Sequence, residues 1–262
     1  MILIRYIFSI LLTVYIGNCF LKYFLKVKKL EGFNKIPYLS ISFFAGIGVI
    51  SSQMLIYSLL KIEWNLISTV LPWLIFLFRK TRPSKITHQF LQNSKPLNLI
   101  YWVFIVLISL QIFLISSRIF IHSEALGWDA ITIWYYKAKV FFVDRGVNMS
   151  VFTDNRLYQE GLSDTFIRSS YPIFLPLYLS FIFISINTFS IFYGNVTWFL
   201  MFLALMSVLF SYLKAKVGIR VSILLLFIFV SLGANFDHIG GKYAGYADLP
   251  LMCFITLATI FF

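Results

Sequence analysis

Long apolar runs alternate with short polar connections along this chain. An α-helix needs about 20 mainly apolar residues to cross a bilayer. By that measure the runs predict about eight membrane segments, of which the third and the last are short, at residues 4–25, 38–60, 62–78, 98–121, 171–189, 191–212, 219–236 and 247–262. Few Pro or Gly residues interrupt the runs, and strand-like alternation at barrel spacing is not present. The pattern therefore predicts an all-α membrane protein, built as a polytopic bundle of transmembrane helices.

Three regions follow from this pattern. Residues 1–121 hold about four N-terminal membrane helices, residues 122–170 form a large polar loop, and residues 171–262 return to apolar runs. The chain ends inside its last apolar run, without flanking polar residues. Because membrane helices usually carry interfacial anchors at their ends, we expect the C-terminal region to be incomplete, as in a fragment of a longer membrane protein.

Composition and charge agree with a membrane location. The chain is 60% hydrophobic and 12% charged, with a mean hydropathy of +0.87, whereas about 25% of residues in a soluble domain are charged. The net charge of +12 lies mostly in short loops, so membrane topology and anionic lipid explain it better than nucleic acid does. Cys19 and Cys253 both lie within apolar runs, which indicates free thiols rather than a disulfide or metal site.

The distribution of Lys and Arg predicts an orientation. These residues gather in the loops after the first and third predicted segments, so both loops are expected in the cytoplasm. The N-terminus and the loop at 122–170 would then lie outside. Lys214, Lys216 and Arg220 also have a cytoplasmic character, but two full crossings between 171 and 212 would put them outside. We therefore expect the helix pair at 171–212 to be partly re-entrant or interfacial.

Residues 128–143 open the large loop with the pattern of an amphipathic helix. At 100° per residue, four polar side chains gather within a sector of roughly 80°: Asp129, Thr132, Tyr136 and Lys139. The opposite half holds Trp128, Ala130, Ile131, Trp134, Tyr135, Ala138, Phe141 and Phe142. Such a helix lies in the plane of the interface with its rings toward lipid. Asp129 would then face water near the head groups; alternatively, its carboxylate caps the helix of an ordinary connector.

A second polar cluster ends the large loop. Arg168 and Tyr171 precede Pro172, where the next apolar run begins. Both Arg168 and Tyr171 are candidates for binding phosphate. The alternative is an ordinary helix start with an interfacial tyrosine, because Pro is favoured in a first helical turn and Tyr at the interface.

A third cluster is the Gly-rich turn between the last two apolar runs. It contains Lys242 and Tyr246 and ends at Asp248, where the final helix is expected to begin. An acidic residue at a membrane boundary is a candidate functional residue, although it can also serve as a helix cap. Asp237 and His238 could ligate a divalent cation, but two residues alone are weak support for a metal site.

The order of short motifs in these three clusters resembles the GT-C superfamily of polytopic membrane glycosyltransferases. It is similar to the bacterial members grouped with protein mannosyltransferases and aminoarabinose transferases. The resemblance covers residues 120–250, about half of the chain. The motifs are Trp128-Asp129-Ala130, then Trp134, then Lys137-Ala138-Lys139, then Tyr171-Pro172 before Leu175-Pro176, and finally Gly245-Tyr246-Ala247-Asp248-Leu249-Pro250.

The resemblance implies a function and roles for individual residues. It implies a polyprenyl-phosphate sugar donor, a glycan, lipid or protein acceptor, and a site facing outward from the bacterial inner membrane. It also implies that Asp129 is the catalytic base, that Asp248 is a second acidic position and that Tyr171-Pro172 shapes the substrate cleft. Two features depart from the family pattern: the large loop follows the fourth apolar segment rather than the first, and the chain is short.

The chemistry is consistent with these residue types. Transfer from a lipid phosphate needs a base for the acceptor hydroxyl, a role that Asp129 can fill. It also needs cations that stabilise the departing phosphate, for which the candidates are Lys137, Lys139, Arg168 and Lys242. We expect Tyr171, Tyr246 and Asp248 to complete the substrate contacts. The sequence requires no cofactor, although a divalent cation at Asp129 and Asp248 is compatible with it.

Two other functions stay open at this point. A transporter or flippase for a lipid-linked or anionic substrate would suit the apolar helices and basic residues. It would also favour charged residues deep in several helices and internal repeats, and we find few such charges and no clear repeat. An inactive fragment or a membrane scaffold is the third alternative, because the chain ends abruptly.

Overall fold

The structure is a computed structural model that describes residues 1–25, 35–77, 98–121, 127–149 and 171–261. These residues form helices and connecting turns, with no strand among them. Within them, four helical stretches are long and apolar enough to cross a membrane: α1 (Ile2–Cys19) with the π-helix Phe20–Phe24, α2 (Lys35–Leu59), α4 (Leu99–Ile121) and α9 (Ile191–Val230). The prediction of an all-α membrane protein is confirmed.

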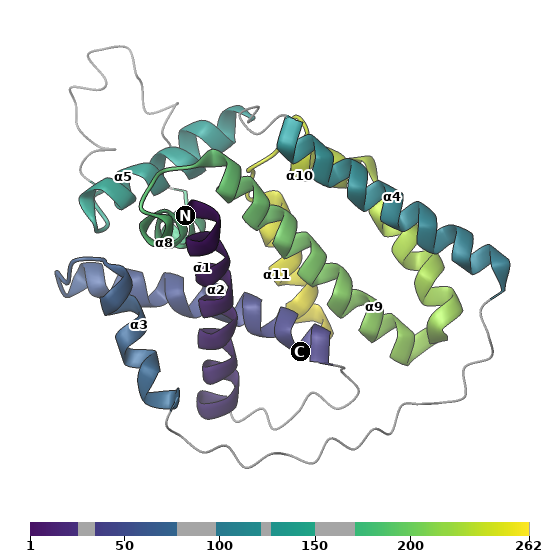
Figure 1. Ribbon diagram of the computed structural model, residues 1–262, viewed down its shortest axis with the longest axis horizontal. Coiled ribbons are helices and arrows are strands. Elements are labelled where there is room, and N and C mark those ends of the chain that lie inside the picture. Colours follow the sequence, from purple (N-terminus) through teal and green to yellow (C-terminus); the bar gives the residue numbers. More distant parts are fainter. Residues whose placement is uncertain (26–34, 78–97, 122–126, 150–170, 262) are drawn as a thin grey trace.

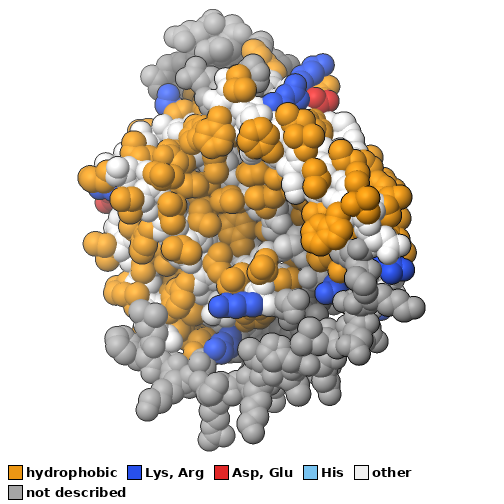
Figure 2. Space-filling view, turned by 45° about the vertical axis from the view of Figure 1, so that its right-hand side comes forward, with side chains coloured by type: hydrophobic (Ala, Val, Ile, Leu, Met, Phe, Trp, Pro, Cys, Tyr) orange, Lys and Arg blue, Asp and Glu red, His pale blue; other side chains and the backbone are white. Residues whose placement is uncertain are grey.

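The described surface has the distribution expected beside lipid. In Figure 2, hydrophobic side chains form a broad band, and most Lys and Arg side chains lie toward its upper and lower edges. α4 contributes strongly to this exterior, because most of its side chains are at least partly exposed. Since hydrocarbon lipid tails accept apolar side chains and exclude charges, such a band matches a membrane-embedded exterior.

The N-terminal part is organised around a close crossing of α1 and α2 (Figure 1). A Cβ atom built at Gly17 would lie 1.8 Å from the Ser42 carbonyl oxygen, and one at Gly46 would lie 1.9 Å from the Thr13 carbonyl oxygen. Small residues let membrane helices approach backbone to backbone. The two glycines therefore permit a contact that any larger side chain would separate.

Three predicted membrane segments give short helices in the structure. The run at 62–78 gives α3 (Leu66–Leu74) and a 3-10 turn (Ile75–Leu77), the run at 171–189 gives α8 (Phe174–Ile186), and the run at 247–262 gives α11 (Asp248–Phe261). At 1.5 Å per residue, the 13 residues of α8 rise about 20 Å, less than the roughly 30 Å of a hydrocarbon core. The third and the last runs are therefore short, as the sequence predicts, whereas the run at 171–189 gives a shorter helix than predicted.

The short length of α8 is relevant to the predicted topology of residues 171–212, where two full crossings would place the basic residues after 212 outside the cytoplasm. Twelve of its 13 residues are buried within the protein, so α8 is a core helix rather than one that faces lipid. A short, buried α8 is compatible with a pair that does not cross the membrane twice before Lys214, and the re-entrant arrangement stays a prediction.

Two predicted segments, 191–212 and 219–236, fall mainly within α9. Gly218 interrupts this helix with φ 80° and ψ 163°, a backbone region that is essentially limited to glycine. Figure 1 shows the chain reversing here, so that the second half of α9 returns beside α4. Phe104 of α4 and Phe227 of α9 pack with ring centroids 5.0 Å apart. The single glycine thus divides α9 into two helices, the second of which packs on α4.

A proline inside α3 explains a polar cluster at the α2–α3 contact. Pro72 has no N–H, so the Ser68 carbonyl lacks its donor in the helix. The Tyr57 hydroxyl donates to that carbonyl at 2.9 Å. The Gln53 amide donates to the Thr69 carbonyl at 3.0 Å and accepts from the Trp73 indole N–H at 2.8 Å. The cluster satisfies its own polar groups, as buried groups require.

Candidate active site

The helix predicted at 128–143 is present, but its first part is not an α-helix. Residues Ala130–Tyr135 form a π-helix, which continues into α5 (Tyr136–Asp144). The backbone N–H of Tyr136 accordingly bonds the carbonyl of Ile131, five residues earlier. Short π-helical turns are rare and frequently lie at functional sites.

Much of the apolar half predicted for this helix is buried in the protein. Trp128 and Ile131 are exposed, as contact with lipid allows, whereas Trp134, Tyr135 and Phe141 are buried. The prediction that the rings of this half face lipid is therefore wrong for these three. The 100° spacing assumed for an α-helix also does not hold through Ala130–Tyr135.

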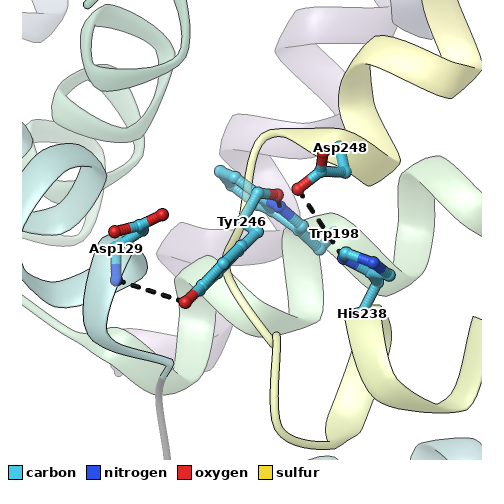
Figure 3. A network of polar contacts seen from close by, with 5 residues as sticks. All are labelled: Asp129, Trp198, His238, Tyr246 and Asp248. Carbon is cyan, nitrogen blue, oxygen red and sulfur yellow. Dashed lines mark hydrogen bonds and ion pairs between the residues drawn. The ribbon is translucent and has the colours of Figure 1, made fainter. Parts of the chain in front are cut away.

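Asp129 and Asp248 line one pocket, with a volume of about 470 Å³. Asp129 comes from the start of the π-helix and Asp248 from the first turn of α11. In Figure 3, Tyr246 lies between the two carboxylates. The other lining residues are Trp134, Tyr171, Pro172, Phe174, Leu175, Ala247, Pro250, Leu251 and Phe254. Two acids 119 positions apart in the sequence therefore share one cavity with aromatic walls.

Tyr246 joins the two sides of this pocket. Its hydroxyl accepts a long hydrogen bond of 3.4 Å from the Asp129 backbone N–H (Figure 3). Its carbonyl accepts from the indole N–H of Trp198 at 2.7 Å. Trp198 is buried in α9, so this bond anchors the turn before α11 to the core of the protein.

The close approach at Tyr246 depends on Gly127. A Cβ atom built at Gly127 would lie 2.3 Å from the Tyr246 ring and 2.8 Å from the Lys242 carbonyl oxygen. Contacts this short require the tyrosine ring or the backbone to move. The absence of a side chain at Gly127 therefore lets the start of the π-helix pack directly on the Gly-rich turn.

Asp129 has no capping role in this structure. It occupies the N-cap position of the π-helix, but its side chain makes no capping hydrogen bond. The alternative in which its carboxylate caps an ordinary connector is therefore not supported. Its side chain lines the pocket instead.

Lys137 contacts the part of the pocket wall that Trp134 and Tyr171 form. Its ammonium group donates to the Tyr171 carbonyl at 3.0 Å, and the Tyr171 ring packs edge-on against Trp134 with centroids 5.8 Å apart. Burial lowers the pKa of Lys137 to about 8, because it disfavours the charged form. Lys137 thus acts on the wall through Tyr171 rather than lining the pocket, which differs from the substrate contact that we expected.

The other predicted cations lie away from the described pocket lining. The Lys139 ammonium sits over the ring of Phe189 at 5.4 Å, and that of Lys242 over the ring of Tyr243 at 5.2 Å. Arg168 lies outside the described residues. Of the residues predicted from the sequence, the pocket brings together Asp129, Tyr171, Tyr246 and Asp248.

The pocket offers ligands for a cation only in part. Within the described ranges, no group of three or more His, Cys, Asp or Glu side chains could hold a metal ion. Magnesium, however, is commonly bound by one or two carboxylates together with substrate phosphates and water. Asp129 and Asp248 supply two carboxylates to one pocket, so the protein alone does not provide a complete cage for a metal ion.

A larger apolar groove of about 830 Å³ adjoins the pocket. Phe174 and Phe254 line both cavities, so the two meet at these rings. α2 forms much of the groove wall through residues such as Phe44, Gly48 and Ile56, and α11 adds Leu257 and Phe261. The lining is almost entirely apolar, and the amide of Gln53 at its edge already has partners.

The sequence alone did not point to Trp198, Phe174 or Phe254. The Trp198 indole donates a hydrogen bond to a backbone carbonyl. Every residue has such a carbonyl, so the sequence does not show which one the indole contacts. The two phenylalanines lie in apolar runs and are indistinguishable there from lipid-facing residues. His238 was noted only as a weak metal ligand, and it lies 3.9 Å from Asp248.

Comparison of the chain with protein-family models, with curated proteins and with solved structures finds no match.

Proposed function

We propose that this protein is a membrane glycosyltransferase that uses a polyprenyl-phosphate-linked sugar. The observation that carries the proposal is the junction at Phe174 and Phe254, where a pocket with two carboxylates meets an apolar groove. A lipid-linked sugar has the same division between a polar head and an apolar chain. The motif resemblance to the GT-C superfamily adds independent support.

The proposed reaction assigns the base to Asp129. Its ionised carboxylate takes the proton of an acceptor hydroxyl or amine, and the acceptor atom attacks the anomeric carbon of the donor sugar. The bond from that carbon to the phosphate oxygen breaks, and the electron pair leaves with the polyprenyl phosphate. The proton on Asp129 then passes to water, so the products are the glycosylated acceptor and the free lipid phosphate.

Charge stabilisation completes the proposal. The departing phosphate gains negative charge, which cationic groups or a divalent ion stabilise. Candidates are an ion shared by Asp129 and Asp248, or the side chains of Lys242 and Arg168. The prenyl chain would occupy the groove beside α2, and the site would face outward from a bacterial inner membrane.

Replacement of the base tests the reaction. We expect Asp129→Asn to lower sugar transfer by about 10²-fold or more, the range for a positioned acid–base group, while the protein still inserts into the membrane. The measurement is turnover of a polyprenyl-phosphate sugar by the purified protein, with and without divalent cation.

Asp144→Asn is the matched control for this test. Asp144 ends α5, is exposed, and pairs with Asn148 at 2.8 Å outside the pocket. It should retain full transfer. Unchanged turnover in Asp129→Asn would refute the assignment of the base.

The groove also supports a second candidate, a transporter or flippase for lipid-linked or anionic substrates. An open apolar groove beside a polar pocket would suit the passage of a lipid with its head group. Movement of a polyprenyl phosphate by protein reconstituted in vesicles, without any sugar transfer, would favour this second function.

A further inference from the structure

Two phenylalanines, Phe174 and Phe254, form an aromatic boundary between the pocket and the apolar groove. Phe174 begins α8 and Phe254 lies in α11, and among the described residues these are the two that line both cavities. Their rings meet edge to face, with centroids 5.5 Å apart and an interplanar angle of 82°. Aromatic rings at this separation are in contact, so no hydrocarbon chain passes between them in this arrangement.

A third ring supports the aromatic boundary from the groove side. Phe44 of α2 packs edge to face on Phe254, with centroids 5.5 Å apart and an interplanar angle of 76°. Phe44 is buried and lines the groove but not the pocket. The three rings therefore form a row from α2 through α11 to α8, with the aromatic boundary at its α8 end.

The helices that carry the aromatic boundary are packed firmly in the protein. Every residue of α8 except Phe174 is buried. α11 packs through Leu249, Cys253 and Leu257, which are buried and lie on one helical face because they are four positions apart. Close-packed interiors resist the movement of whole elements. A ligand that spans both cavities therefore opens the boundary by turning one ring into another rotamer, not by separating the helices.

We propose that Phe174 and Phe254 select lipids by the number of hydrocarbon chains that cross the aromatic boundary. Rotation of one ring releases the space of that ring, which accommodates one chain and excludes two chains side by side. A lipid phosphate with a single chain then reaches from the pocket into the groove, whereas a two-chain phospholipid is rejected by a steric clash. The inference rests on the proposed function only in expecting a lipid phosphate as ligand.

The membrane itself makes such a selection necessary. The phospholipids around the protein also combine a phosphate head group with apolar tails, so contacts to the head group do not separate them from a polyprenyl phosphate. Specificity is a difference between affinities, and a clash against the wrong ligand is one way to obtain it. The aromatic boundary supplies this difference from the tail side.

Competition between lipids that share a head group tests the proposal without requiring catalysis. The full chain in phosphatidylcholine nanodiscs would bind labelled geranylgeranyl phosphate in the presence of Mg²⁺, and either lysophosphatidate or phosphatidate would displace it. All three lipids carry a phosphate monoester, and phosphatidate alone has two chains. We expect lysophosphatidate to compete about tenfold or more better than phosphatidate, a discrimination within reach of the shape of an apolar site.

Removal of either ring should abolish the selection. In Phe174→Ala and in Phe254→Ala, the preference for lysophosphatidate should fall from about tenfold to about twofold, because phosphatidate gains access. Loss of folding would not produce a gain of binding. Each substitution opens the boundary by itself, so one folded variant is sufficient for the test.

Phe24→Ala is the matched control. Phe24 lines the groove but not the pocket, and its side chain is exposed. Its removal should weaken both competitors by the same factor and preserve the preference. The proposal is overturned if the two competitors displace the probe equally from the wild-type protein, if both boundary variants keep the wild-type preference, or if the wild-type protein does not bind the probe.

The two proposals fail in different ways. Sugar transfer by a protein that binds lysophosphatidate and phosphatidate equally would refute the chain selection and leave the transferase intact. A preference that disappears in Phe254→Ala, in a protein that transfers no sugar, would refute the transferase and leave the chain selection intact.

Discussion

Asp129 and Asp248 illustrate what the sequence reveals about individual residues. Both are acids next to apolar runs, where an ionised side chain is costly, so each could be singled out from its position alone. The structure brings them to one pocket. Their chemistry is therefore visible in the sequence, whereas their shared cavity depends on how α11 and the π-helix pack.

Lys137 illustrates the opposite case. The sequence places it in a Lys-Ala-Lys motif with Lys139, and the two appear equivalent as phosphate ligands. In the structure Lys139 is exposed and Lys137 is buried against Tyr171. Both lysines lie in α5, where side chains two positions apart project about 200° from each other, so one faces the core and the other faces outward.

Gly127→Ala should disturb the junction of the π-helix with the Gly-rich turn. The new methyl group would lie 2.3 Å from the Tyr246 ring, so the ring must move away from the Asp129 backbone. We expect a loss of about 1–3 kcal/mol in stability, which is typical of an overpacked site, together with reduced lipid-phosphate binding.

Gly146→Ala is the control for that substitution. A Cβ atom there would meet its nearest neighbour at 3.8 Å, an ordinary contact. Thermal unfolding in detergent and a binding titration would compare the two variants. Equal behaviour of Gly127→Ala and Gly146→Ala would contradict the packing described at Tyr246.

The buried Lys137 predicts a pH-dependent stability. Because burial lowers its pKa from 10.5 to about 8, the unfolded chain binds more protons at this site between those values. Stability attributable to Lys137 should therefore rise as the pH increases from about 8 to 10.5. The cost of burying the charge is fully present below pH 8 and disappears above pH 10.5.

Lys137→Met would reveal this contribution by comparison. Between pH 8 and pH 10.5, the melting temperature of the wild-type protein should rise by a few degrees relative to that of Lys137→Met. The size follows because 1 kcal/mol corresponds to about 2–4 °C in a chain of this size. Lys139→Met, at an exposed position of the same helix, should show no such trend. A constant difference between wild type and Lys137→Met would argue against a buried, titrating lysine.

Among the elements, the long apolar helices and the short third and last runs were predictable, whereas the burial of α8 was not. α1, α2 and α4 begin and end near the predicted bounds, because hydropathy over about 20 residues is a strong pattern. α8 has the same apolar composition, yet it is a buried core helix of 13 residues. Hydropathy alone does not distinguish burial in protein from burial in lipid.

The π-helix is the element on which the pocket depends. Removal of one residue from Ala130–Tyr135 should restore an α-helical turn and rotate the preceding residues by about 100° relative to α5. Deletion of Thr132, which is partly exposed, should therefore turn Asp129 out of the pocket. We expect sugar transfer and lipid-phosphate binding to be lost while the protein still inserts into membranes.

A deletion outside the π-helix provides the comparison. Asn148 follows α5 in the sequence, so its deletion shortens the same region without rotating Asp129. Transfer should persist in that variant. Retained transfer after deletion of Thr132 would show that the π-helix does not place Asp129 for the proposed reaction.

At the scale of the whole molecule, the apolar groove joins several distant helices and meets the pocket at Phe174 and Phe254. Its walls come from α2, α3, α11 and the π-helix after α1. The sequence predicted the apolar helices but not the groove, because a cavity depends on how distant helices pack.

Gly48→Leu should narrow the groove without disturbing the fold. A Cβ atom at Gly48 meets nothing within 4 Å, and leucine is favoured over glycine inside a helix by roughly 0.5–1 kcal/mol. The added side chain would occupy space in the groove. We expect a several-fold weaker apparent affinity for a long-chain polyprenyl donor and a smaller effect on a short-chain analogue.

Gly233→Leu is the matched control, because its position on α10 (Gly233–Gly240) is equally open and lies outside the described groove lining. It should bind both donors as the wild-type protein does. If Gly48→Leu and the wild-type protein have the same affinity for the long-chain donor, the groove does not hold the chain.

The spacing of residues along α11 limits the length of the polar part of any ligand that occupies both cavities. It carries Asp248 at the pocket and Phe254 at the shared boundary with the groove, six positions apart. Six helical residues rise about 9 Å. A ligand that reaches from the carboxylate to the groove must therefore change from polar to apolar within about that length, which favours a compact head group over an extended oligosaccharide.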